Sequence, residues 1–137
     1  MSKKQYMIGD VYMMTFKGTD SEQFGRRPAV IIQNNKGNRY SPNLIVCPIT
    51  KAIKKPEQPT HVFLPSAETG LRLDSIALCE NPVSISKSKV EYKITTLPAE
   101  YMSQIAEATV LSTSLLSFLP VESLKDLWNR AIKLNAA

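Results

Sequence analysis

The sequence has little of what metal-dependent and histidine-dependent enzymes need. It contains one histidine, His61, and two cysteines, Cys47 and Cys79, which stand in separate apolar runs. No pair of these residues has the short spacing typical of zinc ligands. This scarcity excludes a histidine-rich zinc centre and a ribonuclease mechanism built on two histidines. We expect the protein to use no metal and no other cofactor.

Long apolar runs are also absent. No stretch approaches the roughly 20 apolar residues of a transmembrane helix, and the N-terminal stretch MSKKQYMIGD lacks a signal-peptide core. Cys47 and Cys79 are most simply buried, reduced thiols, which are typical of the cytosol. We therefore expect a cytoplasmic protein with no membrane association.

The composition is that of an ordinary globular domain, and its charge is unevenly distributed. The chain has 137 residues, 43% hydrophobic and 21% charged, which predicts one domain over residues 1–137. Residues 1–60 hold ten lysines and arginines against four acids, and residues 61–137 hold seven against eight. The basic first half favours a polyanionic partner such as nucleic acid, although a solvated basic face would look the same.

The first 95 residues have the pattern of short strands separated by turns. We expect strands over Ile8–Phe16, Pro28–Gln33, Leu44–Thr50 (ended near Pro48), Thr60–Leu64 and Ser75–Glu80. The stretch Asn34–Ser41, NNKGNRYS, is dense in turn formers and predicts a hairpin-like connection. The strands indicate a small curved sheet or barrel, hence an α+β fold once the C-terminal helices are added.

The pattern becomes helical after Leu97. Helices are expected over about residues 98–117 and 121–134, with the break at Pro120. The apolar stripe of the first helix comprises Met102, Ile105, Ala106, Thr109, Val110 and Leu116. The stripe of the second helix contains Trp128, which either packs in the core or anchors a second subunit or a partner.

Polar residues stand at the ends of three of the predicted strands. Arg26 and Arg27 of the segment SEQFGRRP precede one strand, Thr50-Lys51 ends a second, and Glu80-Asn81 ends a third. If these ends converge, a guanidinium, a hydroxyl and a carboxylate share one concavity. A carboxylate can take the proton of an RNA 2′-hydroxyl, and an arginine can stabilise charge on the phosphate. Such a set could cleave a phosphodiester without a metal.

Each of these residues also has a structural interpretation. The two arginines could be solvated charges of a turn made by Gly25, and Thr50 could cap the segment that follows it. Glu80 could form a structural ion pair with Arg27. His61 has no obvious partner and is either structural or a base-stacking residue.

The ordered motifs resemble the MazF/PemK (Kid) family of toxin ribonucleases. The resembling segments are GDVY (9–12), SEQFGRRP (21–28), AVIIQN (29–34), GNRYSPNLIVCPIT (37–50), PTHVFL (59–64) and DSIALCEN (74–81). The resemblance implies a small SH3-like barrel with a C-terminal helix and a homodimer. It further implies metal-independent cleavage of single-stranded RNA to a 2′,3′-cyclic phosphate and a 5′-hydroxyl, and a cognate antitoxin that covers the RNA groove.

The resemblance also implies roles for single residues. Arg27, before the proline, and Thr50, which closes the P-I-T motif, match the family's catalytic arginine and threonine, and Glu80 matches an acid that precedes its glutamine. We expect Arg27 to stabilise the phosphate and protonate the leaving group, Thr50 to position the phosphate, and Glu80 to accept a proton. The expected RNA contacts are Gln23, Arg26, Lys51 and Asn81.

The chain departs from the family after Glu80. Where relatives commonly have glutamine and arginine in the pattern E-Q-x-R-T, this chain has Asn81 and Val83. Losing a guanidinium from the RNA face should change base preference, so the cleavage sequence cannot be transferred. Two alternatives stay open: a CcdB-like gyrase-binding toxin on the same scaffold, and a relative that binds RNA but has lost its activity.

Overall fold

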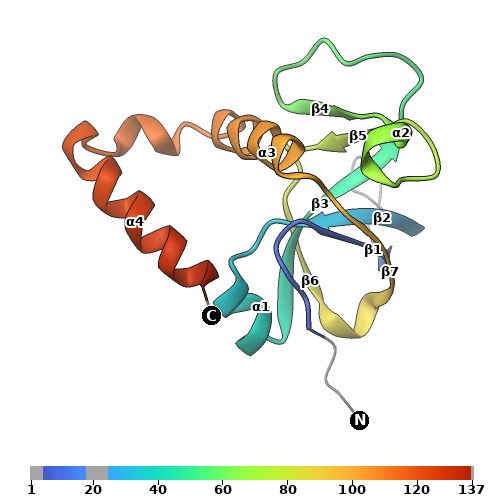
Figure 1. The fold of residues 1–137 in the computed structure, drawn as a ribbon, viewed down its shortest axis with the longest axis horizontal. Coiled ribbons are helices and arrows are strands. Elements are labelled where there is room, and N and C mark those ends of the chain that lie inside the picture. The colour runs from blue at the N-terminus through green and yellow to red at the C-terminus, as the bar shows by residue number, and fades with distance from the viewer. Residues whose placement is uncertain (1–4, 18–24, 137) are drawn as a thin grey trace.

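The computed structural model describes residues 5–17 and 25–136 and has the expected α+β architecture (Figure 1). The strands are β1 (Asp10–Phe16), β2 (Gly25–Ile31), β3 (Asn43–Lys51), β4 (His61–Leu64), β5 (Ser75–Leu78), β6 (Val83–Ser86) and β7 (Val90–Thr96). The α-helices are α1 (Asn35–Tyr40), α2 (Ser66–Thr69), α3 (Ala99–Leu111) and α4 (Leu124–Asn135). Three short 3-10 helices are η1 (Lys87–Lys89), η2 (Leu115–Phe118) and η3 (Val121–Ser123).

Strand β3 is the centre of a barrel-like antiparallel sheet. The strand order is β4-β5-β3-β2-β1-β7, and β6 pairs with the first half of β3. The second half of β3 pairs with β5, so Pro48 stands where β3 exchanges one neighbour for the other. A proline is tolerated there because it lies between the residues that pair with β6 and those that pair with β5. The strand therefore continues past Pro48 to Lys51, further than the sequence indicated.

The apolar core is divided into two clusters on opposite sides of the central strands. Along β2, Val30 packs in the first cluster, whereas Ala29 and Ile31 pack in the second. This is the alternation expected of a strand whose two faces are both buried. The apolar, β-branched stretch in the sequence thus correctly indicated a central strand.

Helix α3 covers the first cluster. Its buried residues are Tyr101, Ile105 and Ala108. Their spacing of four and three residues places them on one face of the helix, which packs against β4 and the first cluster. The prediction of a helix to residue 117 was too long: α3 ends at Leu111, Val110 is 43% exposed, and Leu116 lies in η2.

The turn-rich stretch after β2 joins two paired antiparallel strands, as a hairpin connection does, but most of it forms helix α1 instead of a simple turn. The Asn34 side chain caps this helix by accepting a hydrogen bond from the Gly37 N–H at 2.8 Å. The buried Asn38 amide donates to the carbonyl of Gln33 at 2.9 Å. Asparagine favours helix caps as well as turns, so composition alone could not separate the two structures.

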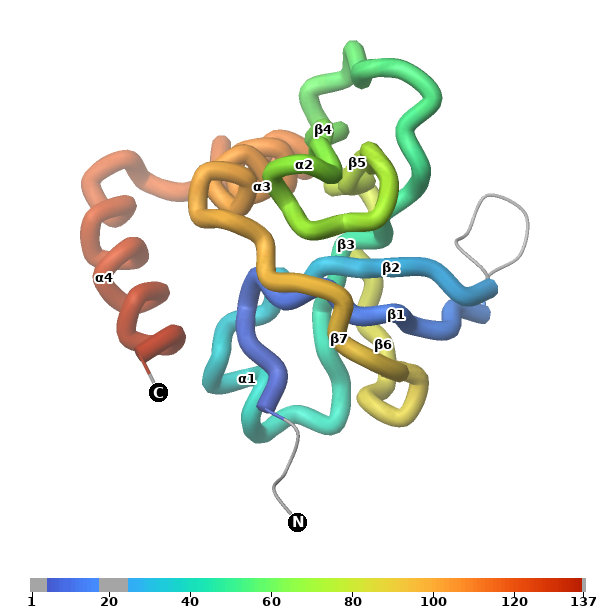
Figure 2. Tube along the Cα trace, turned by 45° about the vertical axis from the view of Figure 1, so that its right-hand side comes forward, coloured from blue at the N-terminus to red at the C-terminus, as the bar shows by residue number. Residues whose placement is uncertain are grey.

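Helix α4 extends away from the sheet and approaches α1 at its C-terminal end (Figure 2). There the Asn35 N–H donates to Asn135 Oδ1 at 3.0 Å. No residue of α4 is buried, and Trp128 is 64% exposed, so of its two interpretations packing in the core does not apply. Within the described ranges, every helix is too short or too polar to cross a membrane.

Candidate active site

The two arginines of the segment SEQFGRRP lie inside β2 rather than in the turn before it. The strand begins at Gly25, whose φ of 78° is readily adopted by glycine. Arg26 pairs with Thr15 of β1, and Arg27 pairs with Met14. Successive side chains of a strand point to opposite faces, so the two arginines belong to different surfaces. Gln23, predicted to contact RNA, lies outside the described residues.

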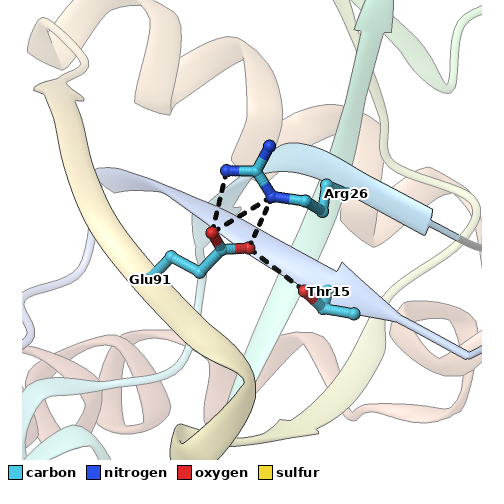
Figure 3. Close-up of polar contacts among 3 residues, drawn as sticks. All are labelled: Thr15, Arg26 and Glu91. Atoms are coloured by element: carbon cyan, nitrogen blue, oxygen red, sulfur yellow. Dashed lines mark hydrogen bonds and ion pairs between the residues drawn. The ribbon is translucent and has the colours of Figure 1, made fainter.

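Arg26 is held by Glu91 of β7 (Figure 3). Its Nε and Nη2 donate to the Glu91 carboxylate at 2.8–3.1 Å, and the Thr15 hydroxyl donates to the same carboxylate at 3.1 Å. The hydrogen bond from Arg26 lowers the pKa of Glu91, and Glu91 in turn raises the pKa of Arg26. The Arg26 side chain is still 58% exposed. Sequence reasoning missed Glu91, which is distant along the chain.

Arg27 is half-buried on the opposite face of β2. It shares that face with Ala29, which packs in the second cluster. Ala29 pairs with Pro48 of β3, where the paired residues of β2 and β3 end; two residues further along lie Arg27 on β2 and Thr50 on β3. Residues directly opposite in antiparallel strands point to the same face. That the Arg27 guanidinium and the Thr50 hydroxyl form one site stays a prediction.

Thr50 is the second-last residue of β3 and lies in the part of that strand that pairs with β5. Its partner there is Ile76, and the segment that follows Lys51 is not helical, so Thr50 does not cap a helix. Thr50 lines a pocket of about 480 Å³, which we call the first pocket. The polar and basic residues beside it there include Lys51, Arg72 and Tyr92.

Arg72 of the first pocket was not singled out from the sequence. It lies in the segment between α2 and β5 and is exposed. Nothing in the local sequence pattern distinguishes Arg72 from other loop cations. It lines the same pocket as Thr50 because β3 pairs with β5, the strand that follows Arg72. It adds a second positive charge beside Lys51, which suits an anionic ligand.

Glu80 follows β5 and is bound to His61 of β4. Its Oε1 lies 2.8 Å from His61 Nε2, with the two side chains 35% and 20% exposed. The structure thus supplies the partner that sequence reasoning could not find for His61. Glu80 lies in the turn that follows β5, two residues after the strand ends and four residues beyond Ile76, the partner of Thr50.

The departures from the family pattern come directly after Glu80 in the chain. The Asn81 N–H donates to the carbonyl of Leu78 at 3.1 Å and closes the turn after β5. Val83 begins β6, pairs with Val46 and packs against the second cluster. The apolar residue at position 83 therefore has a packing role in this chain.

The two cysteines belong to the first cluster, where they are buried and form no disulfide, as expected. A hydrogen bond with Cys79 and burial raise the pKa of Cys47, and the hydrogen bond with Cys47 lowers the pKa of Cys79. Across residues 5–17 and 25–136, no three histidine, cysteine or acidic side chains gather into a metal-binding group.

Comparison with known proteins identifies the scaffold. The family model described as the PemK-like, MazF-like toxin of type II toxin–antitoxin systems matches residues 8–112. The chain belongs to this family. It is also 41% identical over 111 residues to endoribonuclease EndoA of Bacillus subtilis, an alignment that covers 80% of this chain and 96% of the relative.

Solved structures of the family share the fold. MazF of Deinococcus radiodurans superposes with a TM-score of 0.68 at 22% identity, covering 85% of this chain and 100% of that one. The Mycobacterium tuberculosis toxin MazF-mt6 gives a TM-score of 0.63 at 22% identity, covering 75% and 94%. These matches confirm the expected α+β toxin fold, and membership in the PemK/MazF family favours it over the CcdB-like alternative.

Proposed function

We propose that this protein is a metal-independent endoribonuclease that cuts single-stranded RNA at short sequences, as the toxin of a toxin–antitoxin pair. Its family membership and its 41% identity to an endoribonuclease support this activity. The observation that supports the proposal is the register of β2 and β3, which, continued by two residues beyond Ala29 and Pro48, would set Arg27 opposite Thr50, a residue that lines the first pocket. A guanidinium and a hydroxyl in that arrangement suit one phosphate group.

The proposed reaction is an internal transfer at phosphorus. The RNA 2′-hydroxyl loses its proton and attacks the adjacent phosphate, the bond to the 5′ oxygen breaks, and that oxygen takes up a proton. The products are a 2′,3′-cyclic phosphate and a 5′-hydroxyl. Arg27 stabilises the negative charge that develops on phosphate and protonates the 5′ oxygen, while Thr50 holds a phosphate oxygen.

The sequence assigns Glu80 the role of accepting the proton of the 2′-hydroxyl, which stays a prediction. Its contact with His61 gives it a second candidate role, that of orienting the imidazole. A proton acceptor must lie within hydrogen-bond reach of the proton it removes. Kinetic measurements on Glu80 variants should therefore distinguish acceptance of the 2′-hydroxyl proton from orientation of His61.

The predicted RNA contacts differ in strength. Lys51 lies beside Thr50 in the first pocket, and its ammonium suits a backbone phosphate. Arg26 is already bound to Glu91, so it contributes less free charge to RNA binding. Asn81 is half-buried in the turn after β5 and offers its amide to a base edge.

The proposal includes the family's partners. The structural relatives include a mycobacterial endoribonuclease in complex with its cognate antitoxin, at 20% identity and a TM-score of 0.61 over 78% of this chain and 93% of that one. We expect this chain to form a homodimer, to be inhibited by an antitoxin encoded with it, and to act in the cytoplasm.

The test is cleavage of a long single-stranded RNA in EDTA by wild type, Thr50→Val and Arg27→Lys, with mapping of the new 5′ ends. Wild type should cut at a recurring short sequence, and each variant should lose about 100-fold or more in rate. Thr113→Val and Arg39→Lys, at exposed positions outside the site, are the matched controls and should cut normally. Near-normal cutting by either site variant would refute the assignment, and wild-type RNA binding without cuts would indicate a decayed relative.

A further inference from the structure

A second pocket lies next to the first and has a different chemistry. Its volume is about 300 Å³, and it is formed mainly by the segment between β3 and β4. The residues that line it include Lys51, Lys54, Lys55, Glu57, Gln58, His61 and Ile76. Three ammonium groups, one carboxylate, an amide, an imidazole and an apolar side chain thus surround one opening, in which positive charge predominates.

The floor of the second pocket is the outer face of the small sheet β4-β5-β3. Val62, Ala77 and Ile49 form a buried row on the inner face of this sheet. The neighbouring row, Phe63, Ile76 and Thr50, lies on the outer face and is half-buried in all three strands. By the same alternation His61 belongs to the outer face. His61 and the candidate catalytic Thr50 therefore share one surface of the sheet.

Lys51 connects the two pockets, because it lines both of them. A polyanionic strand with one phosphate at Thr50 can pass Lys51 and continue over the outer face of the sheet. The lysines of the second pocket stand along that path, with Lys55 Nζ 5.8 Å from the Phe63 ring centroid. Positive charge along a path with flat or apolar surfaces is how single-stranded RNA is held.

The His61–Glu80 pair determines what the second pocket can recognise. A carboxylate only accepts hydrogen bonds, so at the 2.8 Å contact His61 Nε2 donates to Glu80. The neutral imidazole then has Nδ1 as an acceptor, and its ring orientation is fixed by the carboxylate. An acceptor on a flat ring suits the amino group and the face of a nucleobase.

We propose that the second pocket binds a nucleobase next to the cleaved bond, that His61 reads this base, and that Glu80 positions His61. The inference rests on the endoribonuclease activity proposed above and adds a specificity site to it. Glu80 acts through His61 on substrate selection rather than on the proton of the 2′-hydroxyl. The lysines hold the phosphates that flank the bound base.

The test is steady-state cleavage of a set of short RNAs that contain the wild-type site and vary one flanking base at a time. In His61→Ala, KM for the preferred RNA should rise about tenfold while kcat changes little, because one base contact is lost. The base preference at one flanking position should disappear. Glu80→Ala should reproduce this effect, and Glu80→Gln, whose amide oxygen can still accept from His61, should recover most of it.

Two controls distinguish an effect on the second pocket from a change in overall charge and from a loss of folding. Lys54→Ala should raise KM, whereas Lys125→Ala, the same change of charge on α4, should not. The circular dichroism and melting temperature of each variant report on folding.

If wild type cuts RNA and His61→Ala keeps the base preference, the inference is wrong and the activity stands. If Glu80→Gln loses kcat as severely as Thr50→Val, Glu80 is the proton acceptor and the positioning role is wrong. If wild type cuts no RNA, the proposed function itself fails.

Discussion

The body of the protein, residues 8–112, and its C-terminal segment, residues 113–136, use apolar side chains in opposite ways. Every side chain of the apolar core precedes residue 109. Ile105 of α3 is 1% exposed, whereas Ile132 of α4 is 46% exposed. The family model ends at residue 112, so the match ends close to where burial ends.

The difference has a simple physical origin. The body joins strands that are distant in sequence, and both faces of its central strands can be covered. Helix α4 has 12 residues, a length at which an isolated helix is only marginally stable in water. Its contacts with the body include the two hydrogen bonds between Asn135 and Asn35. Amphipathic spacing alone thus does not determine whether a stripe is buried.

The largest effect that tests this comparison is expected from two isoleucine truncations. Ile105→Ala removes buried apolar atoms and should lower the free energy of unfolding by about 2–5 kcal/mol. Ile132→Ala, the same change on α4, should alter it by about 0.5 kcal/mol or less. Urea unfolding followed by circular dichroism measures both. An equally large loss for Ile132→Ala would show that α4 is buried in the protein as it exists in solution.

A second, smaller contrast concerns two asparagines at the junction of body and segment. Asn38 is 1% exposed, and its amide donates to Gln33 and Asn35. Asn38→Ala leaves buried partners unsatisfied and should cost about 1–3 kcal/mol. Asn135→Ala removes one side-chain hydrogen bond, to the Asn35 N–H, from a residue that is itself exposed, and should cost less than about 1 kcal/mol, although hydrogen exchange in α4 should quicken. A larger drop in melting temperature for Asn135→Ala than for Asn38→Ala would contradict this prediction.

Strands β1 to β5 were predictable, because apolar runs of strand length mark them directly, whereas β6 and β7 were not among the expected strands. Thr50 follows such a run, and its place at the end of a β3 ladder confirms that pattern. The partition of Arg26 and Arg27 between two faces was not predictable. It depends on β2 beginning at Gly25, within the segment that the sequence assigned to a turn.

The polar pairs of the site could be identified only once the strand topology was known. His61 and Glu80 are 19 residues apart, and they meet because β4 pairs with β5. Arg26 and Glu91 are 65 residues apart, and they meet because β1 pairs with both β2 and β7. A single sequence contains no local signal for such pairs, since their spacing follows from strand order rather than from helical or strand periodicity.

The smallest effect compares two surface ion pairs, Arg26–Glu91 in the body and Arg130–Asp126 in α4. The first is short and reinforced by Thr15, whereas the second is a single contact of 3.7 Å between side chains that are 69% and 75% exposed. Arg26 lowers the pKa of Glu91 below its ordinary value of 4.5. Its contribution to stability is therefore present above that value and is lost as the pH falls through the lower value of the folded state.

Glu91→Gln should consequently reduce the difference in unfolding free energy between neutral pH and about pH 3. Asp126→Asn, the matched change on α4, should leave that difference unchanged, because an exposed and poorly aligned pair contributes almost nothing. Urea unfolding of both variants across this pH range measures the slopes. Identical slopes for wild type and Glu91→Gln would mean that the bonds among Arg26, Glu91 and Thr15 organise the surface of the sheet without stabilising it.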